Sequence, residues 1–436
     1  MPDQPNVLFL ITDQLSREAL EISGNKHASM PHLDTLARSG TFFHRAYCTA
    51  PVCGPARSSL YTGCMPHQTG VVHNGLREDP LLPNLCELFC EGGYDVAWAG
   101  PWHLDTPPVV TTRFDHGAFQ PLDIPPARPR LGAQIDGPTA DAAIDYLRSR
   151  LPRERPFFLT VPLTNPHDIC YWVMNRADDS DPDGPLPPLP DSFSDARVPD
   201  FVERCRRRTY YGQENSFTLH WKRERWREYL REYYALGTLV DAEVGRILSA
   251  LEELGLSDST LVVHTADHGE GMARHGWVVK LMYYESVVGV PLTLRLPGVI
   301  PAGLEDHAHL ISGDDLLPTL LDYAGIARPD HMTGRSLRNR IEDSTVGGRE
   351  FVVIQLHPDT EDLAFGARIL ITHRYKYVAL SHGDRNGQEL LFDLEEDPDE
   401  LCDLSSDDAH TRVVDEHRQQ LRTWMAEHAD DFALPL

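Results

Sequence analysis

Cys53 is the most reactive residue of a short segment, Cys-Gly-Pro-Ala-Arg, at residues 53–57. Proline is well tolerated in the first turn of a helix, so Pro55 predicts a helix that begins near Cys53 and runs through Arg57 and Leu60. The free N–H groups and the dipole at such a helix start attract anions, and Arg57 adds a fixed positive charge one turn later. The segment therefore indicates an oxyanion-binding site that contains a sulfur atom.

Two other roles for Cys53 fit the same residues. It could be a small buried residue before a helix. It could also be a thiolate nucleophile, because a helix N-terminus lowers the pKa of a thiol. Such a nucleophile would be expected beside a basic partner and a glycine-rich phosphate loop, and the segment shows neither.

Two apolar segments of the chain each end in a pair of potential metal ligands. Asp13 and Gln14 follow residues 6–12, and Asp267 and His268 follow residues 259–266. In an open α/β sheet, ligands bind beyond the carboxyl ends of the strands, so the two pairs meet if their strands are neighbours. Carboxylate and amide oxygens suit Ca²⁺ or Mg²⁺, and an added imidazole also permits Mn²⁺. Either pair alone is equally typical of a turn at a strand end.

Strands and helices alternate along most of the chain, and this alternation predicts how the chemical groups are held. Near-continuous apolar runs are typical of parallel strands covered on both faces. Amphipathic runs between them are typical of helices that pack on the sheet. The pattern predicts an α/β fold with an open, mostly parallel central sheet and helices on both faces. The expected strands are residues 6–12, 94–100, 156–164 and 259–267, and the expected helices are residues 30–40, 139–150 and 231–256.

The sequence changes character after residue 345. Residues 351–357, 365–381 and 388–398 alternate between apolar and polar side chains and are separated by turns, as in an antiparallel sheet. Residues 407–429 have the pattern of a terminal helix. We therefore expect a catalytic domain at residues 1–345 and a small α+β domain with an antiparallel sheet at residues 346–436.

Three further segments have structural interpretations. Residues 176–200 are rich in Pro and Asp and predict a long loop. The basic, aromatic residues 220–234 are more typical of a solvated helix face than of a ligand site. Cys86 and Cys90 lie four residues apart, before a pair of glycines. A metal pair is conceivable there, but small apolar residues on the buried face of a helix end fit better.

The composition argues against some classes of partner. The formal net charge is −26, whereas a nucleic-acid-binding surface needs clustered Lys and Arg. No apolar run approaches the roughly 20 residues that span a bilayer, so no membrane partner is expected. Residues 1–14 lack a basic segment and a cleavage site of small residues, so they predict a strand and not a signal peptide. These features together predict a cytoplasmic protein.

Residues 53–63, CGPARSSLYTG, resemble the formylglycine signature of the type I sulfatases, a family of the alkaline phosphatase superfamily. The resemblance covers nearly the whole chain, from PNVLFLITDQ at residues 5–14 through DSTLVVHTADHGE at residues 258–270 to ELLFDLEEDPDELCDL at residues 389–404. It implies an alkaline phosphatase-like fold. It also implies that a maturase oxidises Cys53 to formylglycine, whose hydrated aldehyde is the nucleophile.

The resemblance also implies roles for individual residues. It implies one divalent metal ion, with Ca²⁺ expected first and Mn²⁺ or Mg²⁺ as alternatives, and Arg57 as the residue that holds the formylglycine. Lys280, which lies 13 residues after Asp267, matches the lysine that contacts the sulfate. His103 matches the histidine near the formylglycine hydroxyl, and His167 matches the one at the leaving-group oxygen. The implied metal ligands are Asp13, Gln14, Cys53 as formylglycine, Asp267 and His268.

Departures from the family pattern leave other functions open. Pro101 replaces a lysine, and Ala56 stands where serine is commoner. The CGPAR form and the Asp-Gln pair also occur in the related phosphonate monoester hydrolases. A phosphonate monoester or phosphodiester hydrolase with the same formylglycine is therefore the main alternative function. A catalytically dead anion-binding protein is the second alternative.

Four residues near the catalytic positions in sequence could contact the substrate. Aromatic side chains beside an acidic hydrogen-bonding group suit a sugar ring, although the tryptophans fit a core equally well. The expected substrate is a small-molecule sulfate ester, first of all a sulfated mono- or oligosaccharide. Choline sulfate and aryl sulfates remain open. The four residues are Trp102, Asp168, Tyr171 and Trp172.

Overall fold

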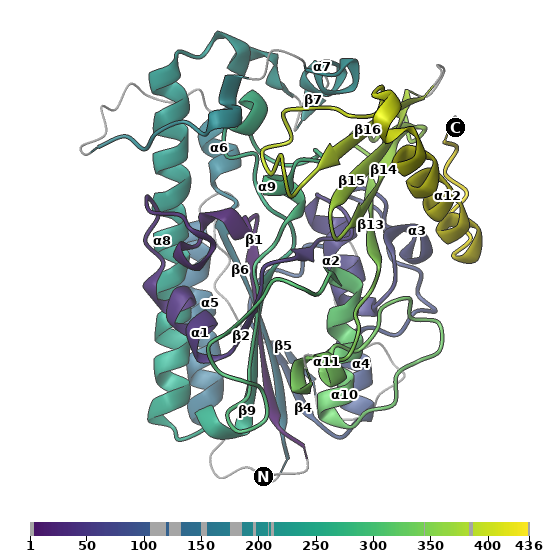
Figure 1. Ribbon diagram of the computed structural model, residues 1–436. Helices are drawn as coiled ribbons and strands as arrows, with labels where there is room; N and C mark the ends of the chain where they lie inside the picture. The colour runs from purple at the N-terminus through teal and green to yellow at the C-terminus, as the bar shows by residue number, and fades with distance from the viewer. Residues whose placement is uncertain are drawn as a thin grey trace.

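The computed structural model describes most of the chain (Figure 1). Among the residues it describes, no helix is both long enough and apolar enough to span a bilayer. The described residues are 4–104, 119–121, 132–149, 155–174, 185–194, 198–207, 209–210, 213–343, 345–382 and 387–434.

An eight-stranded sheet forms the centre of the molecule, in the order β11-β2-β10-β9-β1-β6-β4-β5. All neighbouring strands are parallel except the two pairs that include β10. β1 (Asn6–Asp13) lies between β6 (Phe157–Pro166) and β9 (Thr260–Ala266), and its residues 7–11 have no exposed surface. A strand buried on both faces needs such a continuous apolar run. The other strands are β2 (Thr41–Phe43), β4 (Asp95–Trp98), β5 (Phe119–Pro121), β10 (Leu292–Arg295) and β11 (Leu304–Asp306).

Helices cover both faces of this sheet, as the alternating pattern predicted (Figure 1). α1 (Pro31–Ser39), α5 (Gly132–Ser149) and α8 (Arg223–Glu253) cover the face at the left of Figure 1. The opposite face carries α2 (Cys53–Thr62), α4 (Leu85–Glu91), α10 (Leu316–Ala324) and α11 (Arg338–Glu342). The expected α/β architecture is therefore confirmed.

The basic run at residues 220–234 differs from its predicted structure. Most of it forms the first turns of α8, so this helix begins at Arg223 and not near residue 231. Trp226, Tyr229 and Tyr233 recur at helical spacing and are buried, so the run has a packed face as well as a solvated one. One of the basic residues also packs against another side chain, because the guanidinium of Arg225 lies 4.0 Å from the ring centre of Trp172.

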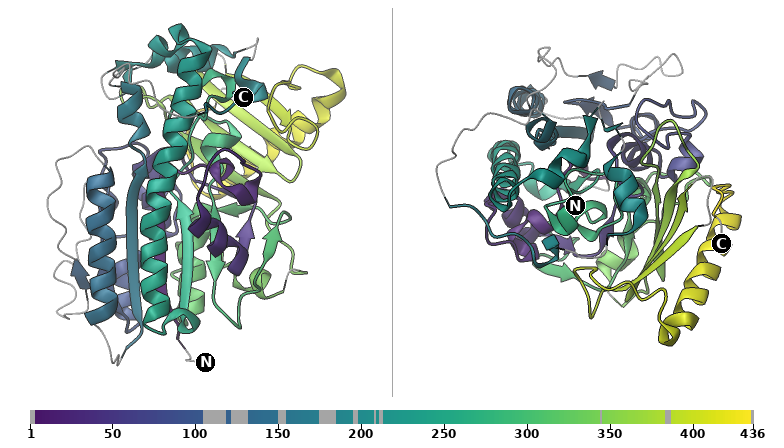
Figure 2. Two further views of the ribbon diagram at one scale, coloured as in Figure 1. Left: turned by 90° about the vertical axis from the view of Figure 1, so that its left-hand side faces the viewer. Right: turned by 90° about the horizontal axis from the view of Figure 1, so that it is seen from above.

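A four-stranded antiparallel sheet forms the C-terminal part of the molecule, as predicted (Figure 2). One face packs against α12 (Thr411–Glu427), through residues such as Leu370 and Leu421. The other face contributes Ile354 and Ile369 to the buried cluster that also contains β1. Because the two parts share one core, the boundary at residues 345 and 346 stays a prediction. The strands are β13 (Phe351–Leu356), β14 (Phe365–Thr372), β15 (Tyr375–His382) and β16 (Gln388–Asp393).

The remaining segments are short. Cys86 is buried and Cys90 is half-buried on α4, in keeping with small apolar residues on a packed helix. The loop expected at residues 176–200 falls partly outside the described residues, which omit 175–184 and 195–197. Short helices and strands are α3 (Pro66–Thr69), α6 (Ile169–Met174), α7 (Asp200–Arg206), α9 (Glu285–Val288), β3 (Ala46–Tyr47), β7 (Thr209–Tyr210), β8 (Gln213–Glu214) and β12 (Ile311–Ser312).

Candidate active site

The carboxyl ends of β1 and β9 bring the two pairs of potential metal ligands together. Thr12 is paired with Ala266 in the parallel ladder, so Asp13 and Asp267 leave the sheet side by side. The backbone N–H of Gln14 donates a hydrogen bond to Asp267 Oδ1 at 3.0 Å. The condition that the two strands be neighbours is therefore met.

Cys53 begins α2 and directs its sulfur into this group of ligands. Its Sγ lies 3.3 Å from His268 Nε2 and 3.6 Å from Asp13 Oδ1. The ligand atoms of Asp13, Cys53, Asp267 and His268 all lie within 4.8 Å of one another, and all four residues are buried. Two buried carboxylates beside an imidazole form a donor set that suits a hard divalent cation.

Arg57 is fully buried and joins the two carboxylates of this cluster. Its Nε donates to Asp267 Oδ2 at 2.8 Å, and its Nη2 donates to Asp13 Oδ2 at 3.1 Å. Burial alone would raise the pKa of Asp13, but the interaction with His167, a hydrogen bond with His103 and the charge of Arg57 hold that pKa well below its usual range. Asp13 is thereby kept ionised, which is the form that a metal ion needs.

Lys280 reaches the cluster from the irregular chain after β9. Its Nζ donates to Cys53 Sγ at 2.8 Å, and the residue has no exposed surface. The backbone carbonyl of Lys280 accepts a hydrogen bond from Trp277 Nε1 at 3.1 Å, which fixes the chain at this position. The lysine that the family resemblance implied thus lies beside the sulfur of Cys53.

His103 and His167 stand on the side of the cluster nearest β6. His103 Nδ1 lies 2.9 Å from Asp13 Oδ2, and the centres of the two imidazole rings lie 6.4 Å apart. Gly100 makes this approach possible, because it has a φ of 123° and a Cβ there would lie 2.3 Å from the Pro162 carbonyl oxygen. Burial, and then the charge of Lys280, lower the pKa of His167 well below its ordinary value.

Gln14 is buried beside the cluster, but its side chain has other partners among the described residues. Its Nε2 donates to the carboxylate of Glu270, and its Oε1 accepts a hydrogen bond from Cys170 Sγ at 3.3 Å. Its backbone φ is 69°, a left-handed conformation that turns the chain sharply at the end of β1. The amide oxygen, not the nitrogen, is therefore the atom that Gln14 can offer to a cation.

The four candidate substrate residues occupy different environments. Trp102 stacks on Tyr61 with ring centres 4.6 Å apart and packs against the core, so its role is at least partly structural. Asp168 Oδ2 accepts a hydrogen bond from the first residue of α5, whereas its buried Oδ1 has no partner in the described part of the chain. The ring of Tyr171 lies 5.7 Å from that of His167. Trp172 instead packs toward α8, with its ring centre 5.8 Å from that of Trp221.

Two residues at the site were not predicted from the sequence. Asn74 Oδ1 accepts a hydrogen bond from the backbone N–H of Gly54 at 2.8 Å and so supports the first turn of α2. Glu270 has no exposed surface and contacts Gln14. Asn74 lies in a loop without a distinguishing pattern, whereas the position of Glu270, three residues after Asp267, is a weak signal that could have been used.

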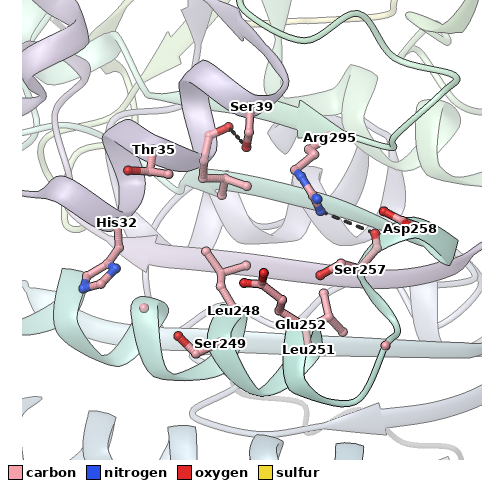
Figure 3. A pocket seen from close by; sticks show the side chains of 13 residues that line it. His32, Thr35, Ser39, Leu248, Ser249, Leu251, Glu252, Ser257, Asp258 and Arg295 are labelled. Atoms are coloured by element: carbon pink, nitrogen blue, oxygen red, sulfur yellow. Dashed lines mark hydrogen bonds between the residues drawn. The ribbon is translucent and has the colours of Figure 1, made fainter.

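A surface pocket of about 490 Å³ lies elsewhere, between α1 and the second half of α8 (Figure 3). His32, Ser249 and Arg295 are among its lining residues, and none of the candidate site residues lines it. The lining includes Gly255, Ser257 and Asp258, which precede β9, so the pocket lies at the amino end of that strand. Ligands of open α/β sheets bind at the opposite, carboxyl end.

The chain is similar to known proteins over nearly all of its length. A family model described as Sulfatase matches residues 5–326, and one described as the C-terminal part of N-sulphoglucosamine sulphohydrolase matches residues 273–427. A Delta 4,5-hexuronate-2-O-sulfatase of Bacteroides thetaiotaomicron is 30% identical over 99% of this chain and 90% of its own. A solved 2-O GAG sulfatase is 28% identical, with a TM-score of 0.87 over 98% of this chain and 93% of that one. A phosphonate monoester hydrolase of Agrobacterium radiobacter, 23% identical with a TM-score of 0.78 over 98% of this chain and 96% of that one, shares the fold.

Proposed function

We propose that this chain, which belongs to the sulfatase family and is a hydrolase of sulfuric esters, acts on a sulfated carbohydrate through a formylglycine made from Cys53. The observation that carries the proposal is the position of Cys53. Its sulfur lies at the start of α2, 2.8 Å from Lys280 Nζ and within a buried cluster of Asp13, Asp267 and His268. The atom that replaces this sulfur in formylglycine would occupy the same surroundings.

A single divalent cation fits the donor set, with Ca²⁺ first and Mn²⁺ or Mg²⁺ as alternatives. Asp13, Asp267 and His268 would hold it, together with the amide oxygen of Gln14 and an oxygen of the formylglycine. When bound, the cation would make the nucleophilic hydroxyl more acidic and offset negative charge on the sulfate oxygens. Arg57 contributes by holding both carboxylates in fixed positions.

Formylglycine would supply a hydrated aldehyde, with one hydroxyl that attacks sulfur and a second that loses its proton to release sulfate. Lys280 binds the sulfuryl oxygens, and a donor of this kind typically lowers the barrier by about 3–4 kcal/mol. His103, hydrogen-bonded to Asp13, is placed to accept the proton of the second hydroxyl.

His167 is assigned to the leaving group. Burial disfavours its protonated form in the free site, but a bound sulfate ester brings a negative charge that favours that form. The protonated ring then donates to the departing sugar oxygen. Its neighbour Tyr171 lies beside the position of that sugar, and the Oδ1 of Asp168, which has no partner within the described ranges, can accept a hydrogen bond from it.

The sugar class is proposed from the relatives. One is described as a hexuronate 2-O-sulfatase and another as a 2-O GAG sulfatase, so a 2-O-sulfated uronide is the first substrate to assay. The Oδ1 of Asp168 adds support, because a buried acceptor of this kind would bind a sugar hydroxyl favourably. A sulfated mono- or oligosaccharide remains the class that we assign.

Two measurements test the proposal. Trypsin releases residues 46–57, and conversion of Cys53 lowers the mass of this peptide by about 18 Da, with fragmentation locating the change. Protein from a host that supplies a maturase should show this loss and release sulfate from a 2-O-sulfated uronide, whereas Cys53→Ala should fold and release none. Faster turnover of a phosphonate monoester would favour the rival hydrolase. A Cys53→Ala variant that retains turnover would overturn the mechanism.

A further inference from the structure

Glu270 joins three elements that meet at the active site. Its side chain has no exposed surface, and it accepts hydrogen bonds from groups on three separate segments of the chain. The donors are the amide Nε2 of Gln14 after β1, the hydroxyl of Tyr229 on α8, and the backbone N–H of Val279. Each of these groups donates to the carboxylate, so Glu270 acts as an acceptor on both oxygens.

This arrangement decides which end of the Gln14 amide points away from Glu270. A side-chain amide has a donor end and an acceptor end, and a carboxylate can pair only with the donor end. Glu270 therefore takes the –NH₂ group and leaves Oε1 on the other side, where Cys170 Sγ lies 3.3 Å away. Since Ca²⁺ and Mg²⁺ bind amides through oxygen, this is the orientation in which Gln14 can serve as a ligand.

The same carboxylate holds the chain that carries Lys280. Val279, which donates to it, directly precedes Lys280 and has a φ of 58°, so the chain turns sharply at this point. The carbonyl of Val279 accepts a hydrogen bond from the N–H of Gly271 at 2.8 Å, which closes residues 271–279 into a loop. The next side chain is then directed to Cys53 Sγ, 2.8 Å from Nζ.

We propose that Glu270 is a positioning residue that turns the Gln14 carbonyl toward the metal site and holds the Lys280 loop at the same time. The inference rests on the proposed function, because it assumes a divalent cation at Asp13, Gln14, Asp267 and His268. It goes beyond that function by assigning the orientation of one ligand and the placement of the sulfate-binding lysine to one buried carboxylate.

The substitution Glu270→Gln tests the amide argument with little change of shape. The N–H of Val279 can only donate, so the amide introduced at position 270 must keep its oxygen there and turn its –NH₂ group toward Gln14. Gln14 must then rotate its own amide to accept, which turns the –NH₂ group of Gln14 toward the metal site. Metal affinity should fall about 10–100-fold, as is typical when the hydrogen-bond partner of a ligand is lost. Calorimetric titration of EDTA-stripped protein with Ca²⁺ or Mn²⁺ measures this without any assay of turnover.

Exchanging the residues at positions 14 and 270 distinguishes an effect on the orientation of the Gln14 side chain from a general loss of structure. In the double variant Gln14→Glu, Glu270→Gln, the –NH₂ group introduced at position 270 can donate to the carboxylate introduced at position 14, and an oxygen again faces the metal. The double variant should therefore recover metal affinity to within about threefold of wild type, a coupling that independent sites do not show. It should do so even if Glu270→Gln alone is too unstable to titrate.

Asp241→Asn is the matched control, since Asp241 is a buried carboxylate that accepts hydrogen bonds from His32 and Leu33, far from the cluster. It should lower thermal stability and leave metal affinity unchanged. The inference would be overturned if Glu270→Gln bound the metal ion as tightly as wild type does, or if the double variant did not bind it. The proposed function would stand in either case. Wild-type protein that binds neither cation would overturn the proposed metal site, and this inference with it.

Discussion

The sulfur of Cys53 lies between a cation and two carboxylates. Lys280 Nζ is 2.8 Å from Sγ, and Asp13 Oδ1 is 3.6 Å from it. Burial, reinforced by the charge of Asp13, raises the pKa of the Cys53 thiol well above its ordinary value, and Lys280 offsets this only in part. The surroundings therefore disfavour a thiolate nucleophile, although the residue begins a helix. They are consistent with a side chain that acts as an aldehyde hydrate.

The role of His167 can be separated from general effects by changing the leaving group. Replacement of His167 by Asn removes the proton donor, so kcat should fall about 10²–10⁴-fold for a sugar sulfate, whose alcohol leaves poorly without a proton. A 4-nitrophenyl sulfate releases a stable phenolate, and its kcat should fall by less than about tenfold. Steady-state kinetics with both substrates measure the difference. Equal losses on the two substrates would contradict the assignment of His167 as the general acid.

At the scale of secondary structure, the two strands that end in potential metal ligands could be predicted because they depend on short-range patterns, whereas their pairing as neighbours could not. The run that forms β1 is nearly continuous in apolar residues, the run of β9 is largely apolar, and each is followed by an acidic residue, Asp13 or Asp267. Right-handed connections and burial then place these strand ends at one edge. The start of α8 could not be placed as well, because the basic residues between Trp226 and Tyr233 obscure its buried face.

The loop that carries Lys280 could not be predicted in the same way. Its course depends on left-handed backbone conformations at several residues that are not glycine, and on the buried acceptor Glu270, neither of which leaves a periodic pattern. In the sequence, only its position three residues after Asp267 distinguishes Glu270 from a solvated glutamate, whereas the fold shows three donors converging on it. The residues with positive φ are Met272, Ala273, His275, Val279 and Leu281.

α5 positions the end of β6, which carries His167, through one carboxylate. Asp136 is buried and accepts hydrogen bonds from the backbone N–H groups of Thr164 at 2.6 Å and Asn165 at 3.0 Å. Asp136→Ala leaves both donors unpaired, at about 1–3 kcal/mol each, so the free energy of unfolding should fall by about 2–6 kcal/mol. Because His167 would also shift, kcat should fall by more than about tenfold.

A graded pair of variants checks this role of Asp136. Asp136→Asn keeps one acceptor oxygen and should lose about half of the stability that Asp136→Ala loses. Asp145→Ala, an exposed position on the same helix, should change the free energy of unfolding by less than about 0.5 kcal/mol. Urea unfolding and kcat are measured on all three proteins. If Asp136→Ala unfolds more easily but keeps wild-type kcat, the carboxylate stabilises the strand end without positioning the histidine.

At the scale of the whole molecule, a buried charge network joins the C-terminal sheet to the catalytic part. Lys376 on β15 lies 2.8 Å from Glu285 on α9 and 2.7 Å from Glu400, and it has no exposed surface. Arg17 lies 3.1 Å from the same Glu285. Removing one member would leave an uncompensated buried charge, so the network favours a single placement of the two parts relative to each other.

Glu400 should make the stability of the whole chain depend on pH. Burial raises its pKa from 4.5 to about 7, because Lys376 lowers it only in part and Glu285 adds to the rise. The folded protein therefore keeps a proton that the unfolded chain releases near pH 4.5. The free energy that this group contributes is fully present below about pH 4.5 and is lost as the pH rises to about 7, by an amount on the order of 3 kcal/mol. Glu285, whose pKa is lowered to about 2, changes the stability only below pH 4.5, so it does not contribute to the change between pH 4.5 and 7.

Glu400→Gln cannot titrate, so its free energy of unfolding should fall less than that of wild type between pH 4.5 and 7. The stability of wild type should fall relative to that of Glu400→Gln by about 3 kcal/mol across this window, and the difference should then stay constant at higher pH. Urea unfolding at constant ionic strength, at half-unit steps of pH, measures both profiles. Glu395→Gln, at an exposed glutamate, should follow the wild-type profile. Parallel profiles for wild type and Glu400→Gln would show that Glu400 is already ionised at pH 5, because Lys376 then outweighs the cost of burial.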